Sequence, residues 1–428
     1  MKKIFITLLC AIGLSPLFAQ DSTLVLSLTE AQDYAVRQNR SMQNASLEVQ
    51  KAHAQRWQTI AAMLPQADAS GQYINMCNYE MNFLGGQKIN MPNYVTANVT
   101  ASIGLNGQAI VGVLLQNIAI EMQDITRQQT ETDLRGNVMT TYMSVKIMES
   151  VTSLLDSTLA NMFTLAEQTR RMVEVGAAEQ TQYDQMLVRV NAMRNNVNQN
   201  KRSVDLAYNT LRVLLGVSAE TELVLTSDPN PEAMSDDILN LLAEPFVKEN
   251  NYNYQLLQKN VELAKKNKAM AGWAYGPTIG ATYQYQKRWD LSEGGFNMTP
   301  PNMVAVSLSL PLWSSGKRAA GITEKKIALM EAQNTFEETS ANLGIQHRQL
   351  CNNLENSYAI FVNENENLKV TNRVMKNVMN KYTWGSASLL ELTNAGNDVI
   401  SAQSTYVQAT MTLIQNFVEL EKFLHNGN

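Results

Sequence analysis

Few residues of this chain have the types and spacing that catalysis or metal binding requires. The 428-residue sequence contains only three histidines and three cysteines. His347 and Cys351 stand four positions apart, so they share one face of a helix and could offer two ligands to a metal ion. Two ligands alone seldom make a site, and a packed helix face explains the pair better. We therefore predict no metal site and no cofactor. We also predict no enzyme, since we find no nucleotide-binding glycine loop and no hydrolase elbow.

Two hydroxyl residues are each followed, three positions later, by a carboxylate residue. They are Thr181 with Asp184 and Ser388 with Glu391. This is the spacing of a capping box, in which the hydroxyl and the carboxylate accept hydrogen bonds from the exposed amides of a helix start. We therefore expect a helix to begin at each of the two pairs.

The elements that position these residues occur twice. Matching residues recur at one constant offset: Asn39 and Asn251, Gln43 and Gln255, Pro65 and Pro277, and Tyr73 and Tyr285. A repeat of this length is a whole structural unit, larger than the short repeats of solenoids. We predict residues 20–216 as the first structural repeat, 217–245 as a linker and 246–428 as the second repeat.

Long stretches with apolar residues at helical spacing predict mainly α-helical structure. We expect helices at residues 29–63, with Thr29 as the N-cap, and at 111–175, 182–215, 319–383 and 389–425. Pro65 and Pro277 mark helix-to-strand breaks, because proline restricts the residue before it and cannot continue a helix. Gly176 and Gly385 separate the paired long helices.

Residues 94–106 alternate between apolar and polar side chains, which predicts a strand with one apolar face. Residues 66–73, 278–287 and 304–310 give three more strands, and residues 222–225 a short one. Aromatic residues cluster in and beside these strands, as interfacial girdles of membrane barrels do: Tyr73, Tyr79, Phe83, Tyr94, Tyr283, Tyr285 and Trp289.

Four strands cannot close a barrel, and an open sheet edge is not tolerated in lipid. Several chains must therefore share one barrel. Two chains would give a barrel filled by side chains, and three would give one wide enough for a pore. The long helices have narrow apolar stripes and many Asn and Gln residues, which suits helices packed side by side around a watery interior.

Residues 1–19 are expected to be a signal peptide, because two lysines precede a short apolar run. Cys10 lies inside that run, too early for lipid attachment, so we expect no lipid anchor. The remaining Cys77 and Cys351 are far apart, which argues against a disulfide framework. The net charge of −5 argues against a nucleic-acid partner.

The chain resembles the TolC-type outer-membrane efflux family over essentially the whole mature sequence. The resemblance is carried by the helix that ends in Leu64-Pro65, by residues 307–313 followed by Gly316, and by Tyr382-x-x-Gly385 followed by Glu391. Residues 173–176 carry the last pattern more loosely. The resemblance implies an internally duplicated subunit of a homotrimeric channel-tunnel. Each chain would give four β-strands to a shared twelve-stranded membrane β-barrel, and its long antiparallel helices to a periplasmic α-barrel.

The same resemblance implies an outer-membrane location that extends into the periplasm, in contact with outer-membrane lipid. The function implied is a passive exit duct of a tripartite efflux or type I secretion system. Its partners would be a periplasmic adaptor, or membrane fusion protein, and an inner-membrane pump of the RND or ABC type. The turns at Gly176 and Gly385 would be the tips where the adaptor docks.

The family pattern also assigns residues to the periplasmic entrance. Glu391 matches the acidic position that rings the entrance, and the family's second acidic position falls on Asn394. Tyr382 and Thr181 keep two positions of the family's closing latch. The latch arginine falls on Ala387 and the latch aspartate on Gln182, so we expect neutral hydrogen bonds there. Asp184 completes the set of entrance residues.

The competing interpretation is a coiled-coil structural protein of the periplasm or cell surface, without a pore. Such a spacer would not need four amphipathic strands with aromatic flanks. The sequence does not name the exported cargo, because selectivity in such systems usually resides in the pump.

Overall fold

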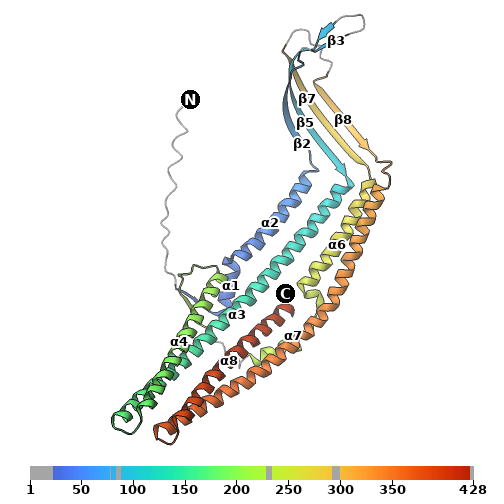
Figure 1. The fold of residues 1–428 in the computed structure, drawn as a ribbon. Helices are drawn as coiled ribbons and strands as arrows, with labels where there is room; N and C mark the ends of the chain where they lie inside the picture. Colours follow the sequence, from blue (N-terminus) through green and yellow to red (C-terminus); the bar gives the residue numbers. More distant parts are fainter. Residues whose placement is uncertain (1–22, 78, 83–87, 228–233, 292–298, 425–428) are drawn as a thin grey trace, which may run out of the picture. The chain divides into compact units, whose positions relative to one another are not determined.

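The computed structural model describes residues 23–77, 79–82, 88–227, 234–291 and 299–424 (Figure 1). The expected signal peptide at residues 1–19 lies outside them, as does Phe83. The chain divides into two compact units, and each draws on both sequence copies. The tip unit comprises Met1–Arg40, Asp133–Leu242 and Asn353–Glu419, and the sheet unit comprises Ser41–Thr132, Ala243–Asn352 and Leu420–Asn428.

The sheet unit contains a four-stranded sheet in the order β2-β5-β7-β8, with every neighbouring pair antiparallel. Its strands are β2 (Gln66–Ile74), β5 (Tyr94–Asn106), β7 (Thr278–Asp290) and β8 (Asn302–Ser309). The prediction of two strands from each copy is therefore confirmed. Within the described residues, β2 and β8 each pair on one side only, so the sheet has two open edges.

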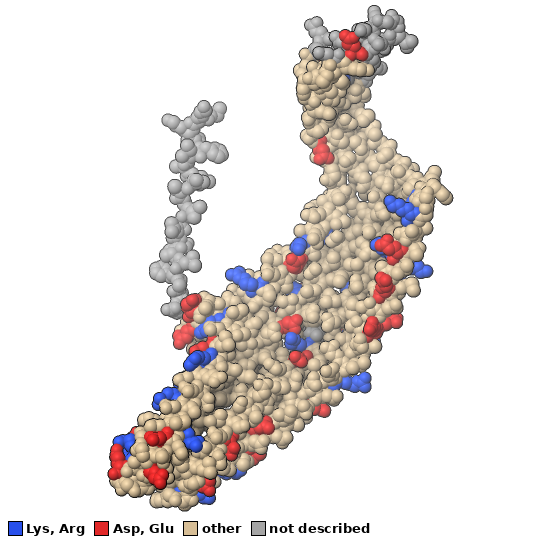
Figure 2. Space-filling view, viewed as in Figure 1, with Lys and Arg blue, Asp and Glu red and all other residues tan. Residues whose placement is uncertain are grey.

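The two faces of this sheet differ in polarity. Residues that pair across strands share a face, and one face carries these apolar side chains: Ala67, Ala69, Tyr73, Val95, Val99, Ile103, Leu105, Ile279, Tyr283, Tyr285, Trp289, Val304, Val306 and Leu308. The opposite face carries polar ones: Gln72, Thr96, Asn98, Thr100, Ser102, Thr282, Gln284, Gln286 and Ser307. The apolar face is open to its surroundings, since Val304, Val306 and Leu308 are 73%, 76% and 72% exposed. In the view of Figure 2 the surface over the strands is almost free of charged residues.

Each strand of the sheet is joined to a long helix. The helices are α2 (Arg40–Ala61), α3 (Gly107–Glu174), α6 (Tyr252–Gly272) and α7 (Lys317–Thr383). Lys259 Nζ lies 2.5 Å from Glu121 Oε2 and links α6 to α3, while Tyr254 packs on Phe336 of α7 with ring centroids 5.0 Å apart. No helix of the described part has an apolar stretch long enough to cross a membrane.

The helix predicted at residues 29–63 is interrupted, so its continuity was wrongly predicted. It forms α1 (Leu28–Gln38) and α2, and Asn39 between them has an extended ψ of 135°. The side-chain Nδ2 of Asn39 donates to Leu214 O over 2.7 Å, at the end of another helix. The N-cap is Ser27 rather than Thr29, because Ser27 forms a capping box with Glu30. A tertiary hydrogen bond thus accompanies the break at Asn39, and a local capping box sets the start of α1.

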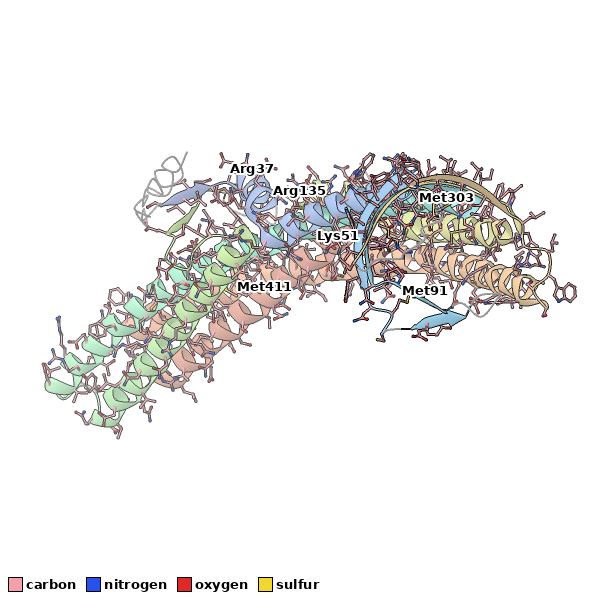
Figure 3. All side chains as sticks on the ribbon, turned by 90° about the horizontal axis from the view of Figure 1, so that it is seen from above. Arg37, Lys51, Met91, Arg135, Met303 and Met411 are labelled. Atoms are coloured by element: carbon pink, nitrogen blue, oxygen red, sulfur yellow. The ribbon has the colours of Figure 1, made fainter. Side chains whose placement is uncertain are left out.

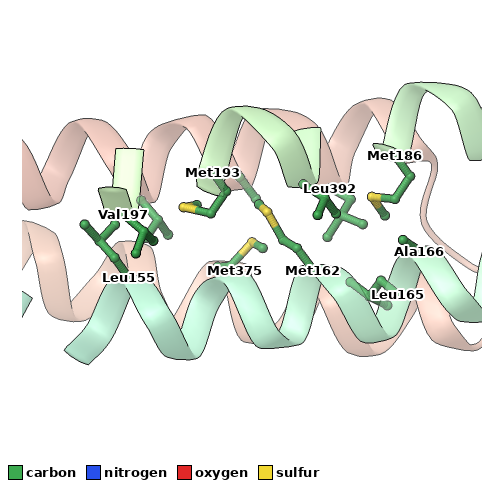
Figure 4. Packing of buried hydrophobic residues seen from close by; sticks show 12 residues of the cluster. Leu155, Met162, Leu165, Ala166, Met186, Met193, Val197, Met375 and Leu392 are labelled. Carbon is green, nitrogen blue, oxygen red and sulfur yellow. The ribbon is translucent and has the colours of Figure 1, made fainter. Parts of the chain in front are cut away.

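The tip unit consists mainly of two antiparallel helix pairs. One pairs α3 with α4 (Gln180–Leu215), and the other pairs α7 with α8 (Leu389–Leu424). Asn200 Nδ2 donates to Thr152 Oγ1 over 2.6 Å in the first pair, and Asn416 Nδ2 donates to Asn353 O over 3.2 Å in the second. Twelve buried residues from all four helices form one apolar cluster (Figure 4).

Smaller elements complete the fold. The expected strand at 222–225 is present as β6 (Leu223–Leu225), but its parallel partner β1 (Leu24–Leu26) was not predicted. Helix α5 (Ser235–Ala243) and the short helix η1 (Lys248–Asn250) follow, and β3 (Glu80–Asn82) and β4 (Lys88–Asn90) form a hairpin. Arg135 of α3, labelled in Figure 3, pairs with Asp33 of α1 over 2.8 Å.

Candidate functional site

The two predicted helix turns have the same backbone geometry. Gly176 and Gly385 adopt φ of 73° and 70°, in the left-handed region that favours glycine. In the first turn, Ala177 N donates to Met172 O over 2.7 Å and Gly176 N donates to Val173 O over 3.0 Å. The second turn repeats both hydrogen bonds. This is the Schellman end of a helix, so glycine is favoured at both positions.

The residue before each turn glycine is apolar and protrudes into solvent. Trp384 is 86% exposed and Val175 is 79% exposed. Leu390, in the first turn of α8, is 68% exposed. Sequence reasoning did not single out these three residues, although their position next to the turn glycines could have drawn attention to them. Exposed apolar side chains at a turn can serve as anchors for a protein partner.

Helix α8 begins as predicted. The amide of Ser388 donates to Glu391 Oε2 over 3.0 Å, and the amide of Glu391 donates to Ser388 Oγ over 3.2 Å. The Glu391 side chain is exposed, and Asn394 is exposed one turn further along the same face. The carboxylate that the family pattern places at the entrance is therefore held against the helix start by its own capping box.

Helix α4 begins differently, and the capping box predicted for Thr181 and Asp184 is wrong. The helix starts at Gln180, so its N-cap is Glu179, which makes no side-chain capping bond. Thr181 Oγ1 donates to Glu179 Oε2 over 3.1 Å, and Asp184 Oδ1 accepts from Gln180 Nε2 over 2.9 Å. A helix that starts earlier than predicted places Thr181 inside the first turn, where its hydroxyl does not cap.

The predicted latch residues are placed as follows. Tyr382 lies in the last turn of α7, and its hydroxyl is 3.2 Å from Thr169 Oγ1 on α3. Thr169 donates its own proton to Leu165 O over 2.9 Å, so Tyr382 must be the donor to Thr169. Thr181 and Gln182 lie exposed in the first turn of α4. Tyr382 therefore joins the two helix pairs through Thr169, a residue that sequence reasoning missed.

A buried apolar cluster supports the tips. It contains Met162 and Leu165 of α3, Met186 and Met193 of α4 and further residues of α7 and α8, and Tyr382 packs against it. A Cβ atom on Gly396 would lie 3.1 Å from Met162 Cε, so α8 approaches α3 closely there. The four helix ends are consequently one packed assembly rather than two independent hairpins.

The proline breaks lie where the sequence predicts them. Helix α2 ends at Ala61, and the side-chain Nε2 of Gln66 donates to Ala61 O over 2.7 Å just after Pro65. Helix α6 ends through the short helix η2 (Trp273–Tyr275), and β7 follows Pro277 directly. Both breaks turn a helix into a strand of the sheet.

The His347–Cys351 pair forms part of a packed helix face. Cys351 Sγ is 3.4 Å from His347 Nε2, and the His347 ring stacks on Phe246 with centroids 4.9 Å apart. Burial lowers the pKa of His347. Across the described residues no three His, Cys, Asp or Glu side chains are grouped as a metal site requires.

The sequence matches the family model described as outer membrane efflux protein, over residues 33–217 and 247–425. No curated protein matches the sequence. Several solved structures share the fold. The CusC structure is 17% identical with a TM-score of 0.75, over 94% of this chain and 92% of that one. The CmeC outer membrane channel of Campylobacter jejuni is 15% identical with a TM-score of 0.76, over 94% and 86%. The MtrE outer membrane channel of Neisseria gonorrhoeae is 16% identical with a TM-score of 0.70, over 94% and 89%.

Proposed function

The chain belongs to the outer membrane efflux protein family, and from that membership we propose that three copies of it assemble into one continuous conduit. It is an outer-membrane exit duct of the tripartite efflux type, and its relatives are outer-membrane channels. The observation that carries the trimer proposal is the four-stranded sheet with an exposed apolar face and two open edges.

The open edges fit one another. Because neighbouring strands alternate in direction from β2 to β8, a β8 edge that meets the β2 edge of a second copy continues the antiparallel pattern. Unpaired backbone groups at an edge cannot be satisfied by lipid, so a closed ring of strands is required in a membrane. Three copies would give a twelve-stranded barrel, which leaves room for a pore.

The two faces of the sheet fit the two environments of such a barrel. The face with Val304, Val306 and Leu308 would lie against outer-membrane lipid, while the face with Thr96 and Asn98 would line the water-filled interior. Lys287 and Trp289 lie near one end of the apolar face, with the ammonium 5.2 Å from the indole ring centre. That combination suits the interface between lipid and water. A coiled-coil spacer without a pore does not account for these two faces.

The helices would continue the conduit through the periplasm, and the tips would bind its partners. We assign the periplasmic adaptor to the turns at Gly176 and Gly385, because Val175, Trp384 and Leu390 expose apolar surface there. The adaptor would connect the duct to an inner-membrane pump of the RND or ABC type, which selects the cargo. The duct itself would be passive and not an enzyme.

The entrance of the duct would be lined by Glu391 and Asn394. Three copies of the Glu391 carboxylate around a threefold axis would attract cations and repel anions, while Asn394 adds no charge. Tyr382, Thr181, Gln182 and Asp184 would form the neutral gate region around it.

The proposal also covers the export of the chain and its division into repeats. Residues 1–19 would be removed as a signal peptide, and the mature chain would carry no lipid. Residues 20–216 and 246–428 would be the two repeats, joined by 217–245, and each repeat would supply one strand pair to the barrel.

Cross-linking tests the shared barrel. In a background with Cys77→Ser and Cys351→Ser, we place one cysteine on each edge strand, Ala69→Cys and Val306→Cys, and treat outer membranes with a flexible bismaleimide. If β2 and β8 of neighbouring copies are adjacent, denaturing gels will show covalent dimers and trimers and no larger species, because a ring of three closes on itself.

The matched control places both cysteines inside one chain. Ala101 and Tyr283 are directly opposed on β5 and β7, so Ala101→Cys with Tyr283→Cys should give cross-linked monomers only. A ladder beyond the trimer would show open-ended association, and monomers alone from the edge pair would overturn the shared barrel.

A further inference from the structure

A cavity that opens to the surface lies in the tip unit, between the two helix pairs. Its volume is about 350 Å³, and it is walled by side chains from α3, α4, α7 and α8. The lining residues used below are Met162, Met193, Met375, Ala192 and Arg189. The volume lies within the range of about 300–1,000 Å³ that is usual for small-molecule sites.

The interior of the cavity is mostly apolar and adaptable. Figure 4 shows the side chains of Met162, Met193 and Met375 pointing toward one another from three helices. Methionine side chains are unbranched and polarizable, so they can rearrange around apolar molecules of different shape. A pocket of this kind would accept an aliphatic or aromatic body without a strict shape requirement.

One lining residue is charged and lacks a partner for its buried nitrogen. Arg189 Nε is buried and donates to no acceptor in the part of the chain that the structure describes. Burial lowers the pKa of the Arg189 guanidinium, and no acidic side chain among the described residues opposes this effect. A buried donor without an acceptor is costly, and more so on a charged group. An anion placed in the cavity would remove that cost.

We propose that this cavity is a binding site for a small amphipathic anion, whose apolar body lies among Met162, Met193 and Met375 while its carboxylate or sulfonate accepts hydrogen bonds from Arg189. A guanidinium can donate two parallel hydrogen bonds to such a group, which fixes the orientation of the ligand. The inference goes beyond the proposed function, because binding to the purified protein requires neither a pump nor transport.

Two dyes with almost the same aromatic body test the site. 8-Anilinonaphthalene-1-sulfonate carries a sulfonate, and N-phenyl-1-naphthylamine lacks it. The full-length protein, in nanodiscs of zwitterionic phosphatidylcholine, is titrated with each dye, and the fluorescence of empty nanodiscs is subtracted. We expect saturable binding of the sulfonate dye and at least about tenfold weaker binding of the neutral one, which is the factor that 1.4 kcal/mol gives.

Variants separate the charge from the cavity. Arg189→Gln should weaken binding of the sulfonate dye by about tenfold and leave binding of the neutral dye unchanged. Arg189→Lys should keep part of the affinity for the sulfonate dye. Arg194→Gln on the same helix is the matched control, because Arg194 is exposed and does not line the cavity. Ala192→Phe fills the space and should abolish binding of both dyes.

Each contrary outcome overturns the proposal. Equal affinity of the wild type and Arg189→Gln for the sulfonate dye would show that Arg189 does not bind the anionic group. Unchanged binding of the dyes to Ala192→Phe would show that they do not bind in the cavity. Equal affinity of the wild type for the two dyes would leave an unspecific apolar pocket. None of these results bears on the cross-linking of the sheet edges, so the two proposals fail separately.

Discussion

The two tips of the molecule share one turn but differ in how the next helix begins. Both turns close through a left-handed glycine, Gly176 or Gly385, with the same pair of backbone hydrogen bonds. After the second turn Ser388 and Glu391 cap α8 reciprocally, whereas α4 begins at Glu179 without a side-chain cap. The turn conformation is thus set by glycine alone, and the stability of the following helix is set by side chains.

The turns differ in a second respect as well. Tyr382 donates to Thr169, but the corresponding position of the first turn is Val173, which has no hydroxyl. The second copy therefore holds both the capping box and the hydrogen bond between the helix pairs. We conclude that the second turn leads into the better-capped helix, while the hydrogen bond from Tyr382 to Thr169 links the two tips to each other.

The largest expected loss of stability concerns Gly216, which has the same left-handed conformation as the turn glycines Gly176 and Gly385. Gly216 ends α4 with φ of 70°, and a Cβ atom there would lie 2.8 Å from Gln38 O. Gly216→Ala should cost about 3 kcal/mol, since a left-handed alanine costs about 1–2 kcal/mol and the backbone contact adds to it. Gly385→Ala should cost only about 1 kcal/mol, because nothing lies within 4 Å of its Cβ position.

Thermal unfolding of the purified protein in detergent measures this difference. The Gly216→Ala protein should unfold at a clearly lower temperature than the Gly385→Ala protein. Equal midpoints would mean that the close approach to Gln38 is relieved at little cost.

A smaller effect tests the two helix starts. Ser388→Ala removes a capping hydroxyl and should destabilise α8 by about 1 kcal/mol. Thr181→Ala should cost less than about 0.5 kcal/mol, because the Thr181 hydroxyl bonds only to the exposed Glu179 side chain. Hydrogen exchange of the first-turn amides reports each helix separately. Faster exchange in α8 alone is expected, and an equal response of α4 would contradict the difference between the tips.

The smallest effect on stability concerns Tyr382. Tyr382→Phe should cost only about 0.5 kcal/mol, because Thr169 keeps its hydrogen bond to Leu165 O. Its effect on the channel should be larger if the bond holds the entrance closed. We expect Tyr382→Phe to raise closed-state leakage in single-channel conductance measurements. Unchanged leakage would show that Tyr382 is not part of the gate. Tyr358→Phe, further from the turn on the same helix α7, is the matched control.

Most of the fold could be predicted from the sequence because its signals are local and occur twice. The alternation in residues 94–106 and the breaks at Pro65 and Pro277 depend on side-chain period and proline geometry alone. The break at Asn39 could not be found in this way, since it depends on a hydrogen bond to Leu214, a residue distant in sequence. Its counterpart Asn251 caps α6 and donates to Phe423 O over 3.4 Å. A comparison of the two repeats could therefore have indicated a helix start next to Asn39.

The candidate site was predicted less well. The glycine turns and the Ser388–Glu391 box follow from local spacing and are confirmed. The Thr181–Asp184 box failed because the same spacing exists inside a helix that starts earlier. Thr169 and Arg189 were missed because neither belongs to a motif. Their roles arise only when α3, α4, α7 and α8 are packed together.

The sheet edges have a consequence for biogenesis. If three copies share one barrel as proposed, a copy that has not yet met its neighbours presents the open edges of β2 and β8, on which another extended polypeptide can pair. Correct association and mispairing are both intermolecular, so the two compete. Shielding of β2 and β8 before assembly would therefore raise the yield of complete channels.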